Sequence, residues 1–189
     1  MSRLRIISGE FGGRLIKAPD GRTTHPMGDR VRSALFARVE VQGKRVLDLY
    51  AGSGAIGLEA LSRGAVWADF VENDKSARRV IEDNIKALDV AAKTKLYKVS
   101  ATIFPEVAQK LNKVYDVVFV DPPYQNFKKN PDGTFDFSTV SALKNIVKPK
   151  GLVVLSYSGR LCVPTVNGVV VVDDHSYGEA ALAVFRFED

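Results

Sequence analysis

Residues Val46–Gly57, VLDLYAGSGAIG, decide the fold of this chain. Val46–Tyr50 is a short apolar run rich in strand formers, glycines then interrupt it, and from Ile56 apolar residues recur at helical spacing. The stretch therefore predicts a strand, a tight glycine turn and a helix. Gly52 and Gly54 allow positive φ angles and a close approach to the backbone, so we expect a ligand to bind this turn.

Two classes of cofactor fit a turn of this kind. Gly52-x-Gly54-x-x-Gly57 matches the dinucleotide fingerprint, and Glu72 follows about 20 residues later, where an acid binds a ribose hydroxyl. Asp48 argues against a dinucleotide, because a charge inside the strand is costly unless it serves a ligand or a hydrogen-bond network. An acid followed by Gly-x-Gly resembles the first motif of S-adenosylmethionine-dependent methyltransferases. The alternative for Asp48 is a helix cap or a buried network.

The composition suits one domain of ordinary size with a small appendage. The chain has 189 residues, of which 46% are hydrophobic, and this is enough to build a core. Its apolar runs, such as Val117–Val120 and Val169–Val172, are too short to cross a bilayer, and the N-terminus lacks the apolar core of a signal peptide. We therefore expect a cytoplasmic protein that does not bind a membrane.

The cysteine count and the net charge limit which kinds of disulfide, metal site and partner the chain can have. Cys162 is the single cysteine, which excludes an internal disulfide, and together with only His25 and His175 it predicts no structural zinc site. The net charge of +5 favours a polyanionic partner, in line with RNA.

The first part of the chain, residues 1–43, is predicted to be a basic appendage. The segments Leu4–Ser8 and Arg14–Ala18 frame a glycine-rich stretch and predict a β-hairpin whose basic residues line one face. Residues 30–39 carry apolar side chains at helical spacing and predict a helix with its arginines facing outward. The basic face suits phosphates, and the alternative is a solvated edge that prevents aggregation.

Residues 44–189 alternate strands and helices, which is typical of a doubly wound, Rossmann-like α/β domain with a mostly parallel sheet. The predicted strands are 45–50, 67–71, 95–99, 115–120 and 152–156. The predicted helices are 56–63, 75–88, 102–111 and 137–147. The two last apolar runs, 166–172 and 180–187, predict an antiparallel pair at one edge, joined by a polar loop at 173–179. This makes a sheet of seven strands.

Ligands collect at the carboxyl ends of the strands in such a sheet. The second strand runs into Glu72–Asp74, where Glu72 can accept hydrogen bonds from both ribose hydroxyls or, alternatively, cap the next helix. The third strand runs into Ser100 and Ala101, which we expect to contact an adenine. The alternative for Ser100 is the N-cap of the helix that follows.

The fourth strand carries the most specific motif. Tyr115–Val120 runs directly into Asp121-Pro122-Pro123-Tyr124. The prolines hold the backbone rigid and leave it with carbonyl acceptors and no donors. An exocyclic amine of a base needs two acceptors, here the Asp121 carboxylate and the Pro122 carbonyl, and Tyr124 can stack on the base for about 1–3 kcal/mol. The alternative is a structural turn.

Segments spread along nearly the whole chain are similar to one known family: Arg5–Gly9, Gly13–Arg14, Arg30–Arg32, Ala34–Phe36, Val46–Ala65, Asp121–Tyr124 and Tyr177–Gly178. These segments resemble the bacterial 16S ribosomal RNA guanine-N2 methyltransferases. The resemblance implies the class I methyltransferase fold and the cofactor S-adenosylmethionine. It also implies methyl transfer to the exocyclic amine of one guanine in 16S rRNA, within an assembled 30S particle.

The motifs and the resemblance together predict a site without a metal, in a protein that we expect to be a monomer. The predicted cofactor-binding residues are Asp48, Tyr50, Gly52, Ser53, Gly54, Glu72, Asn73, Ser100 and Ala101. The predicted catalytic residues are Asp121, Pro122 and Tyr124. The predicted phosphate contacts are Arg3, Arg5, Arg14, Arg30 and Arg32.

Some positions depart from the family pattern. His25-Pro26-Met27 stands where the family usually has Arg-Pro-Thr, Ser33 stands for a glutamate, and Ser100 and Ser156 stand where acids are common. These departures favour one alternative, a non-catalytic RNA-binding assembly factor on a methyltransferase scaffold. An N6-adenine DNA methyltransferase is a second alternative, because it uses the same Asp-Pro-Pro-Tyr motif, and a nicotinamide-dependent oxidoreductase is a third.

Overall fold

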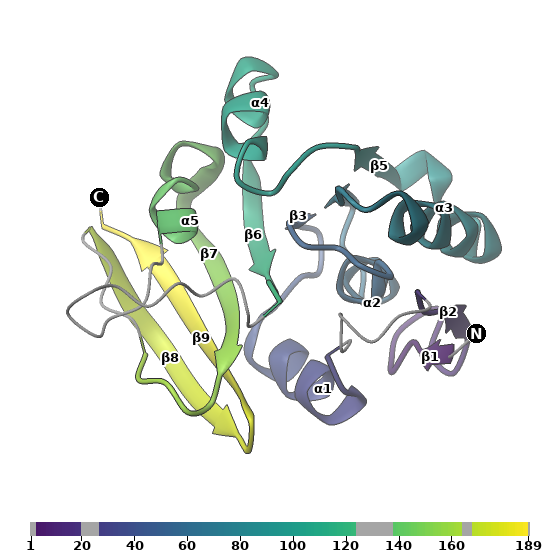
Figure 1. Cartoon of the computed structure of the whole chain (residues 1–189), viewed down its shortest axis with the longest axis horizontal. Coiled ribbons are helices and arrows are strands. Elements are labelled where there is room, and N and C mark those ends of the chain that lie inside the picture. Colours follow the sequence, from purple (N-terminus) through teal and green to yellow (C-terminus); the bar gives the residue numbers. More distant parts are fainter. Residues whose placement is uncertain (1–2, 20–26, 124–137, 164–167, 189) are drawn as a thin grey trace.

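The computed structural model describes residues 3–19, 27–123, 138–163 and 168–188, and its centre is one seven-stranded sheet (Figure 1). Across the sheet the strand order is β5-β4-β3-β6-β7-β9-β8. The strands are β3 (Arg45–Asp48), β4 (Trp67–Val71), β5 (Thr94–Tyr97), β6 (Tyr115–Val120), β7 (Val147–Ser158), β8 (Val169–Tyr177) and β9 (Ala180–Phe187). The predicted doubly wound α/β fold is confirmed.

The order of the strands fixes where a ligand can bind. β3 pairs in parallel with β4 and β6, while β4 pairs in parallel with β5, and β6 with β7. The chain thus builds the sheet outward from β3 to β5, then returns to the other side of β3 for β6. A crevice opens at such a switch point, outside the carboxyl ends of the strands. β9 runs antiparallel to both β7 and β8, which confirms the predicted antiparallel edge pair.

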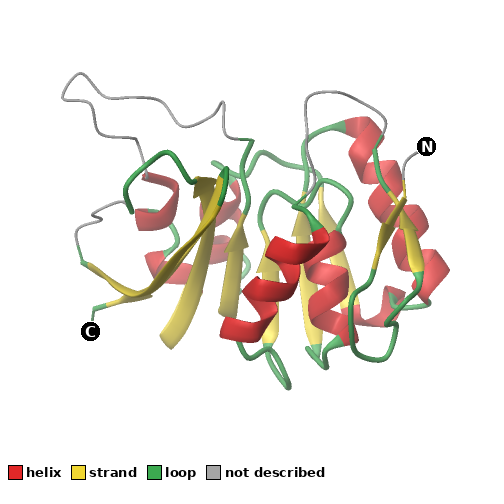
Figure 2. Cartoon of the chain, turned by 90° about the horizontal axis from the view of Figure 1, so that it is seen from below, coloured by secondary structure: helices red, strands yellow, loops and turns green. Residues whose placement is uncertain are grey.

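Helices cover both faces of the sheet (Figure 2). They are α1 (Asp29–Arg38), α2 (Ala55–Ser62), α3 (Lys75–Leu88), α4 (Phe104–Lys110) and α5 (Ser138–Ser141). Side chains alternate across a strand, so neighbouring residues of β3 enter different cores. Val46 packs with residues of α1, α2 and α3 on one face, whereas Leu47 packs with residues of α4 and α5 on the other. Among the described helices none is long and apolar enough to cross a membrane.

The N-terminal segment forms the predicted hairpin, in which β1 (Arg3–Arg5) pairs antiparallel with β2 (Leu15–Lys17). Its apolar side chains Ile6, Phe11 and Ile16 are buried in the same core cluster as Val46 and Phe70 of the main sheet. Residues 1–43 therefore pack on the core of the main domain, as far as the structure describes them.

The helix predicted at 137–147 is wrong in its length. Residue 137 lies outside the described residues, α5 ends at Ser141, and a short 3₁₀ helix over Lys144–Ile146 leads into β7. Ser, Thr and Val have low helix propensities, and they make up all of α5. The short element is held in place by Val140 and Leu143, which are buried under the sheet.

The polar loop predicted at 173–179 is also wrong, because β8 continues to Tyr177 and only Gly178 and Glu179 separate it from β9. β8 is the last strand of the sheet, so its polar side chains, such as Asp174 and His175, remain exposed to water within a strand. A register shift between Val171 and Asp173 interrupts the alternation that would have marked one long strand.

Candidate active site

The glycine turn has the geometry that its sequence predicts. Gly52 and Gly54 have φ angles of 53° and 78°, in the left-handed region that L side chains rarely adopt. Gly54 is the N-cap of α2, and its N–H donates to the Ala51 carbonyl at 2.6 Å. The turn therefore lies at the carboxyl end of β3 with the N-terminus of α2 directly after it.

Asp48 lies behind this turn and is 1% exposed. Its Oδ2 accepts a hydrogen bond from the Gly57 N–H at 3.0 Å, which confirms the helix-cap alternative. Its Oδ1 has no hydrogen-bond partner among the described residues. Burial raises the pKa of Asp48 to about 7, the Gly57 bond opposes this shift, and the carboxylates of Asp121 and Glu72 add to it. Contact of Asp48 with a cofactor stays a prediction.

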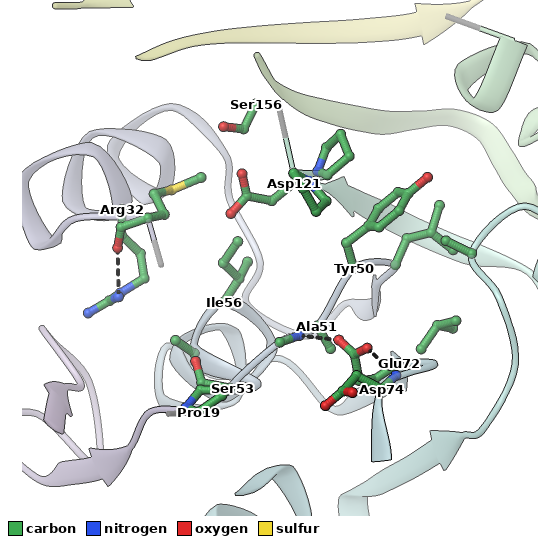
Figure 3. A pocket seen from close by; sticks show the side chains of 18 of the residues that line it. Pro19, Arg32, Tyr50, Ala51, Ser53, Ile56, Glu72, Asp74, Asp121 and Ser156 are labelled. Carbon is green, nitrogen blue, oxygen red and sulfur yellow. Dashed lines mark hydrogen bonds between the residues drawn. The ribbon is translucent and has the colours of Figure 1, made fainter. Parts of the chain in front are cut away.

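An open cavity of about 1050 Å³ lies at the carboxyl ends of the strands (Figure 3). Its walls include seven of the nine predicted cofactor residues, namely Tyr50, Gly52, Ser53, Glu72, Asn73, Ser100 and Ala101. Asp48 and Gly54 are not among its lining residues. Asp121 and Pro122 line the same cavity, whereas Tyr124 lies outside the described residues.

Glu72 joins the ends of β3 and β4. Its Oε2 accepts from the Gly52 N–H and its Oε1 from the Asp74 N–H, both at 2.8 Å (Figure 3). The alternative prediction was that Glu72 caps α3. The N-cap is Asp74, whose carboxylate accepts from the Ala77 N–H. A carboxylate oxygen can accept two hydrogen bonds, so Glu72 keeps capacity for ligand hydroxyls.

Ser100 lies at the cavity wall, and its hydroxyl is 2.8 Å from the Thr102 hydroxyl. The assigned N-cap of α4 is Ile103, but Ser100 opens the turn that leads into this helix: its hydroxyl accepts from the Thr102 N–H at 3.3 Å and its carbonyl from the Phe104 N–H at 3.0 Å. Whether Ser100 contacts an adenine stays a prediction.

Asp121 follows β6 directly and is flanked by β7. Val120 of β6 lies opposite Leu155 of β7, so the next residues, Asp121 and Ser156, are neighbours across the strands. Burial raises the pKa of Asp121 to about 6, and a hydrogen bond from the Ser156 side chain opposes the shift. Figure 3 shows both side chains at the cavity. The sequence marked Ser156 as a departure from the family, but only the strand register identifies it as the partner of Asp121.

Sequence reasoning missed one rim of the cavity. Arg160 and Glu179 line it and form an ion pair of 2.8 Å, with side chains that are 78% and 87% exposed. They follow β7 and precede β9. Since the turn between β8 and β9 was predicted in the wrong place, no signal in the sequence brought these two residues together.

The five predicted phosphate contacts do not share one environment. Arg3, Arg5, Arg14 and Arg30 are exposed, although the Arg14 guanidinium donates to the Ala87 carbonyl in the last turn of α3. Arg32 was predicted to face outward and is fully buried, which corrects that prediction. Its guanidinium donates to three oxygens: the carbonyls of Arg5 and Met27 and the carboxylate of Asp29. Arg32 therefore lies outside the exposed basic face, although it is among the residues that line the cavity.

Solved structures similar to this chain include proteins described as methyltransferases. A putative methyltransferase, yhhF, from Escherichia coli superimposes with a TM-score of 0.80 over 99% of both chains at 28% identity. The strand order and the site at the switch point define the class of S-adenosylmethionine-dependent methyltransferases.

The chain belongs to the family described as Conserved hypothetical protein 95, whose sequence profile matches residues 4–186. It is 31% identical to the putative rRNA methyltransferase YlbH of Bacillus subtilis over 97% of this chain and 98% of that protein. It is 40% identical to the ribosomal RNA small subunit methyltransferase D of Escherichia coli K12, over 65% of this chain and 61% of that protein.

Proposed function

We propose that the protein transfers a methyl group from S-adenosylmethionine to the exocyclic N2 amine of a guanine in 16S rRNA, within the 30S particle. The observation that carries this proposal is the placement of the Asp121 carboxylate and the Pro122 residue on the wall of the cavity that the glycine turn also lines. The relatives named as methyltransferases of ribosomal RNA support the choice of substrate.

The charges of the site fit a cationic cofactor. When bound, S-adenosylmethionine supplies a methyl group on a positively charged sulfur. The carboxylates of Glu72 and Asp121 lie close enough to Asp48 to raise its pKa. A cation bound nearby would reduce the repulsion among these three carboxylates. The Asp48 oxygen without a hydrogen-bond partner among the described residues supports the same conclusion. A dinucleotide phosphate would add negative charge to these carboxylates.

Glu72 and the glycine turn would hold the cofactor at its nucleoside and amino-acid ends. Glu72 already fixes the Gly52 N–H, and its remaining lone pairs can accept the ribose hydroxyls. Gly52 lines the cavity, and a Cβ there would meet no atom of the protein within 4 Å, so its absence leaves room for a ligand to approach the backbone.

Asp121 and Pro122 would orient the acceptor base. The nitrogen lone pair of an exocyclic amine is delocalised into the ring, so the amine reacts poorly until acceptors hold its two hydrogens. With a pKa of about 6, Asp121 is mostly ionised at pH 7 and accepts hydrogen bonds. The Pro122 carbonyl is the second acceptor. Correct positioning then supplies much of the rate, and the amine proton leaves afterwards to Asp121 or to water.

The outer face of the hairpin would contact the RNA. Arg3 pairs with Lys17 and Arg5 with Leu15, so these residues share one face of the ribbon, and all are exposed. A row of cations on an exposed ribbon suits the phosphate backbone. Exposed Arg30 adds a charge at the start of α1.

The test begins with calorimetric titration of the purified protein with S-adenosylmethionine, with NAD as the control. Tritium transfer from the labelled cofactor to undermethylated 30S particles follows, and the modified base is mapped. We expect S-adenosylmethionine to bind and label to appear on a guanine N2. Label on an adenine, or no transfer despite cofactor binding, would reject the proposal.

Asp121→Ala tests the mechanism. We expect this variant to lose transfer and to keep cofactor binding, because the carboxylate acts on the base. The control is Asp116→Asn on the same strand, where the carboxylate accepts from Arg45 and pairs with Lys148 away from the cavity. Turnover retained in Asp121→Ala would refute the role of Asp121.

A further inference from the structure

Asn84 of α3 is a buried amide, 1% exposed, that links two distant parts of the chain. Its Oδ1 accepts from the Lys17 N–H at 2.8 Å, and its Nδ2 donates to the Lys17 carbonyl at 2.9 Å. The same Nδ2 donates to the Ser53 carbonyl, also at 2.9 Å. The side chain thus pairs with β2 as a neighbouring strand would, and its second N–H holds the middle residue of the glycine turn.

Both amide hydrogens of Asn84 are used in these bonds, so neither carbonyl can be released without leaving a buried donor unpaired. Such a loss costs more than the net contribution of a typical hydrogen bond. The two carbonyls share one nitrogen, which places the end of β2 against the turn. Pro19, two residues after Lys17, lines the cavity together with Ser53 (Figure 3).

Ser53 lies between the two glycines with left-handed backbones and is 5% exposed. Its neighbours are held by other bonds: the Gly52 N–H donates to Glu72, the Gly54 N–H donates to the Ala51 carbonyl, and the Gly54 carbonyl accepts from the Leu58 N–H. The bond from Asn84 holds the Ser53 carbonyl. The turn therefore keeps its shape through Glu72 after β4, through bonds within its own backbone and with α2, and through Asn84 of α3.

We infer that Asn84 is a positioning residue for the cofactor, which fixes the glycine turn through the Ser53 carbonyl and ties its shape to the docking of β2. Asn84 itself is not among the residues that line the cavity and touches no reacting atom. The inference rests on the proposed function, since it takes the turn to bind the cofactor.

Ser62 of α2 provides a matched control. It is 4% exposed, and its hydroxyl donates to the Ser8 carbonyl and accepts from the Phe11 N–H. Ser62→Ala and Asn84→Ala therefore each remove two hydrogen bonds between the N-terminal segment and the body. Only Asn84→Ala also removes a bond to the glycine turn.

The experiment measures the Kd for S-adenosylhomocysteine by calorimetry, together with KM for S-adenosylmethionine, kcat and Tm. For Asn84→Ala we expect Kd and KM to rise roughly tenfold, as the loss of one buried hydrogen bond implies, and kcat at saturating cofactor to stay within about twofold. For Ser62→Ala we expect a similar fall in Tm with Kd unchanged. Asn84→Leu, which keeps most of the volume, should repeat the effect on Kd if the alanine variant does not fold.

An unchanged Kd in the Asn84 variants would overturn the inference. An equal rise in Ser62→Ala would overturn it too, because the effect would then come from hairpin docking in general. Failure of the unaltered protein to bind S-adenosylhomocysteine would instead refute the proposed cofactor, so the two failures are distinguishable.

Discussion

At the scale of single residues, Asp48 carries a buried carboxyl group that costs stability when it is ionised. A buried carboxylate with one hydrogen bond and two acidic neighbours holds its proton far more tightly than in the unfolded chain, where its pKa is near 3.8. Between those two pKa values the folded state binds a proton that the unfolded state has released. The contribution of Asp48 to stability therefore falls as pH rises from about 4 to 7, and it stays lost above pH 7.

Asp48→Asn should remove this pH dependence. Asparagine keeps an acceptor for the Gly57 N–H and carries no charge, so we expect the variant to gain stability relative to the original protein as pH rises. With a pKa of about 7, the gain should be about 2–3 kcal/mol larger at pH 8 than at pH 5. Urea denaturation at the two pH values measures it. An equal effect of the substitution at both would show that Asp48 keeps an ordinary pKa.

Residue types alone predicted part of the site. The motifs identified Glu72 and Asp121, which line the cavity, whereas Asp48 lies behind the glycine turn and is not among the lining residues. They did not identify Asn84, since a polar residue within an amphipathic helix pattern looks like a solvated position. They placed Arg32 on the surface for a related reason: its burial depends on carbonyls of the hairpin and of the loop before α1, which no local pattern contains.

At the scale of elements, α2 packs on β4 so closely that one position must be glycine. A Cβ at Gly57 would lie 2.4 Å from Cε1 of Phe70, a ring that is fully buried. Alanine favours a helix by about 1 kcal/mol over glycine, but overpacking a core costs about 1–3 kcal/mol. Gly57, the third glycine of the pattern that matches the dinucleotide fingerprint, thus has a packing role in this protein.

Gly57→Ala should therefore destabilise the protein by up to about 2 kcal/mol despite the better helix propensity. Phe70→Leu removes the ring atom that the new methyl group would meet, so in that background the same substitution should be neutral or stabilising. Denaturation of the two single variants and the double variant completes the cycle. A cost that is the same in both backgrounds would show that the close approach to Phe70 is not the cause.

Helices and strands were predictable where their apolar residues recur with a clear period and the same residues are buried in the structure. The strands β3, β4 and β6 and the helix α3 follow their apolar patterns closely, because each is buried on the faces that the pattern marks. The main errors fall at α5, at β7, which was predicted at 152–156 and spans Val147–Ser158, and at β8. A Ser- and Thr-rich helix of one turn depends on Val140 and Leu143 reaching the core, and a polar edge strand depends on its pairing with β9. Both causes are tertiary contacts.

At the scale of the whole molecule, the hairpin and the edge strands lie at opposite sides of the protein (Figure 1). The hairpin shares its core with the sheet and contributes Pro19 to the cavity wall. An RNA held on the outer face of the hairpin would therefore lie next to the cavity. β9 reaches the cavity only at its first residue, Ala180, and its other end, with Arg186, lies away from it. The net charge of +5 attracts RNA whatever part of the surface binds it. A test must therefore distinguish the effect of where an arginine lies from its effect on the total charge.

The double variant Arg3→Ala/Arg5→Ala tests that position against Arg186→Ala, an exposed arginine on β9. Each phosphate contact releases about 0.7–0.9 counterions, so losing two contacts should reduce the slope of log K for 16S rRNA against log salt by about 1.4–1.8. Arg186→Ala changes the net charge by one unit but removes no predicted contact, so we expect its slope to equal that of the unaltered protein. Filter binding across a series of salt concentrations gives all three slopes. If the double variant kept the original slope, the hairpin would not be part of the RNA surface. If Arg186→Ala reduced the slope to a similar extent per charge, RNA binding would depend on the total charge and not on where the arginines lie.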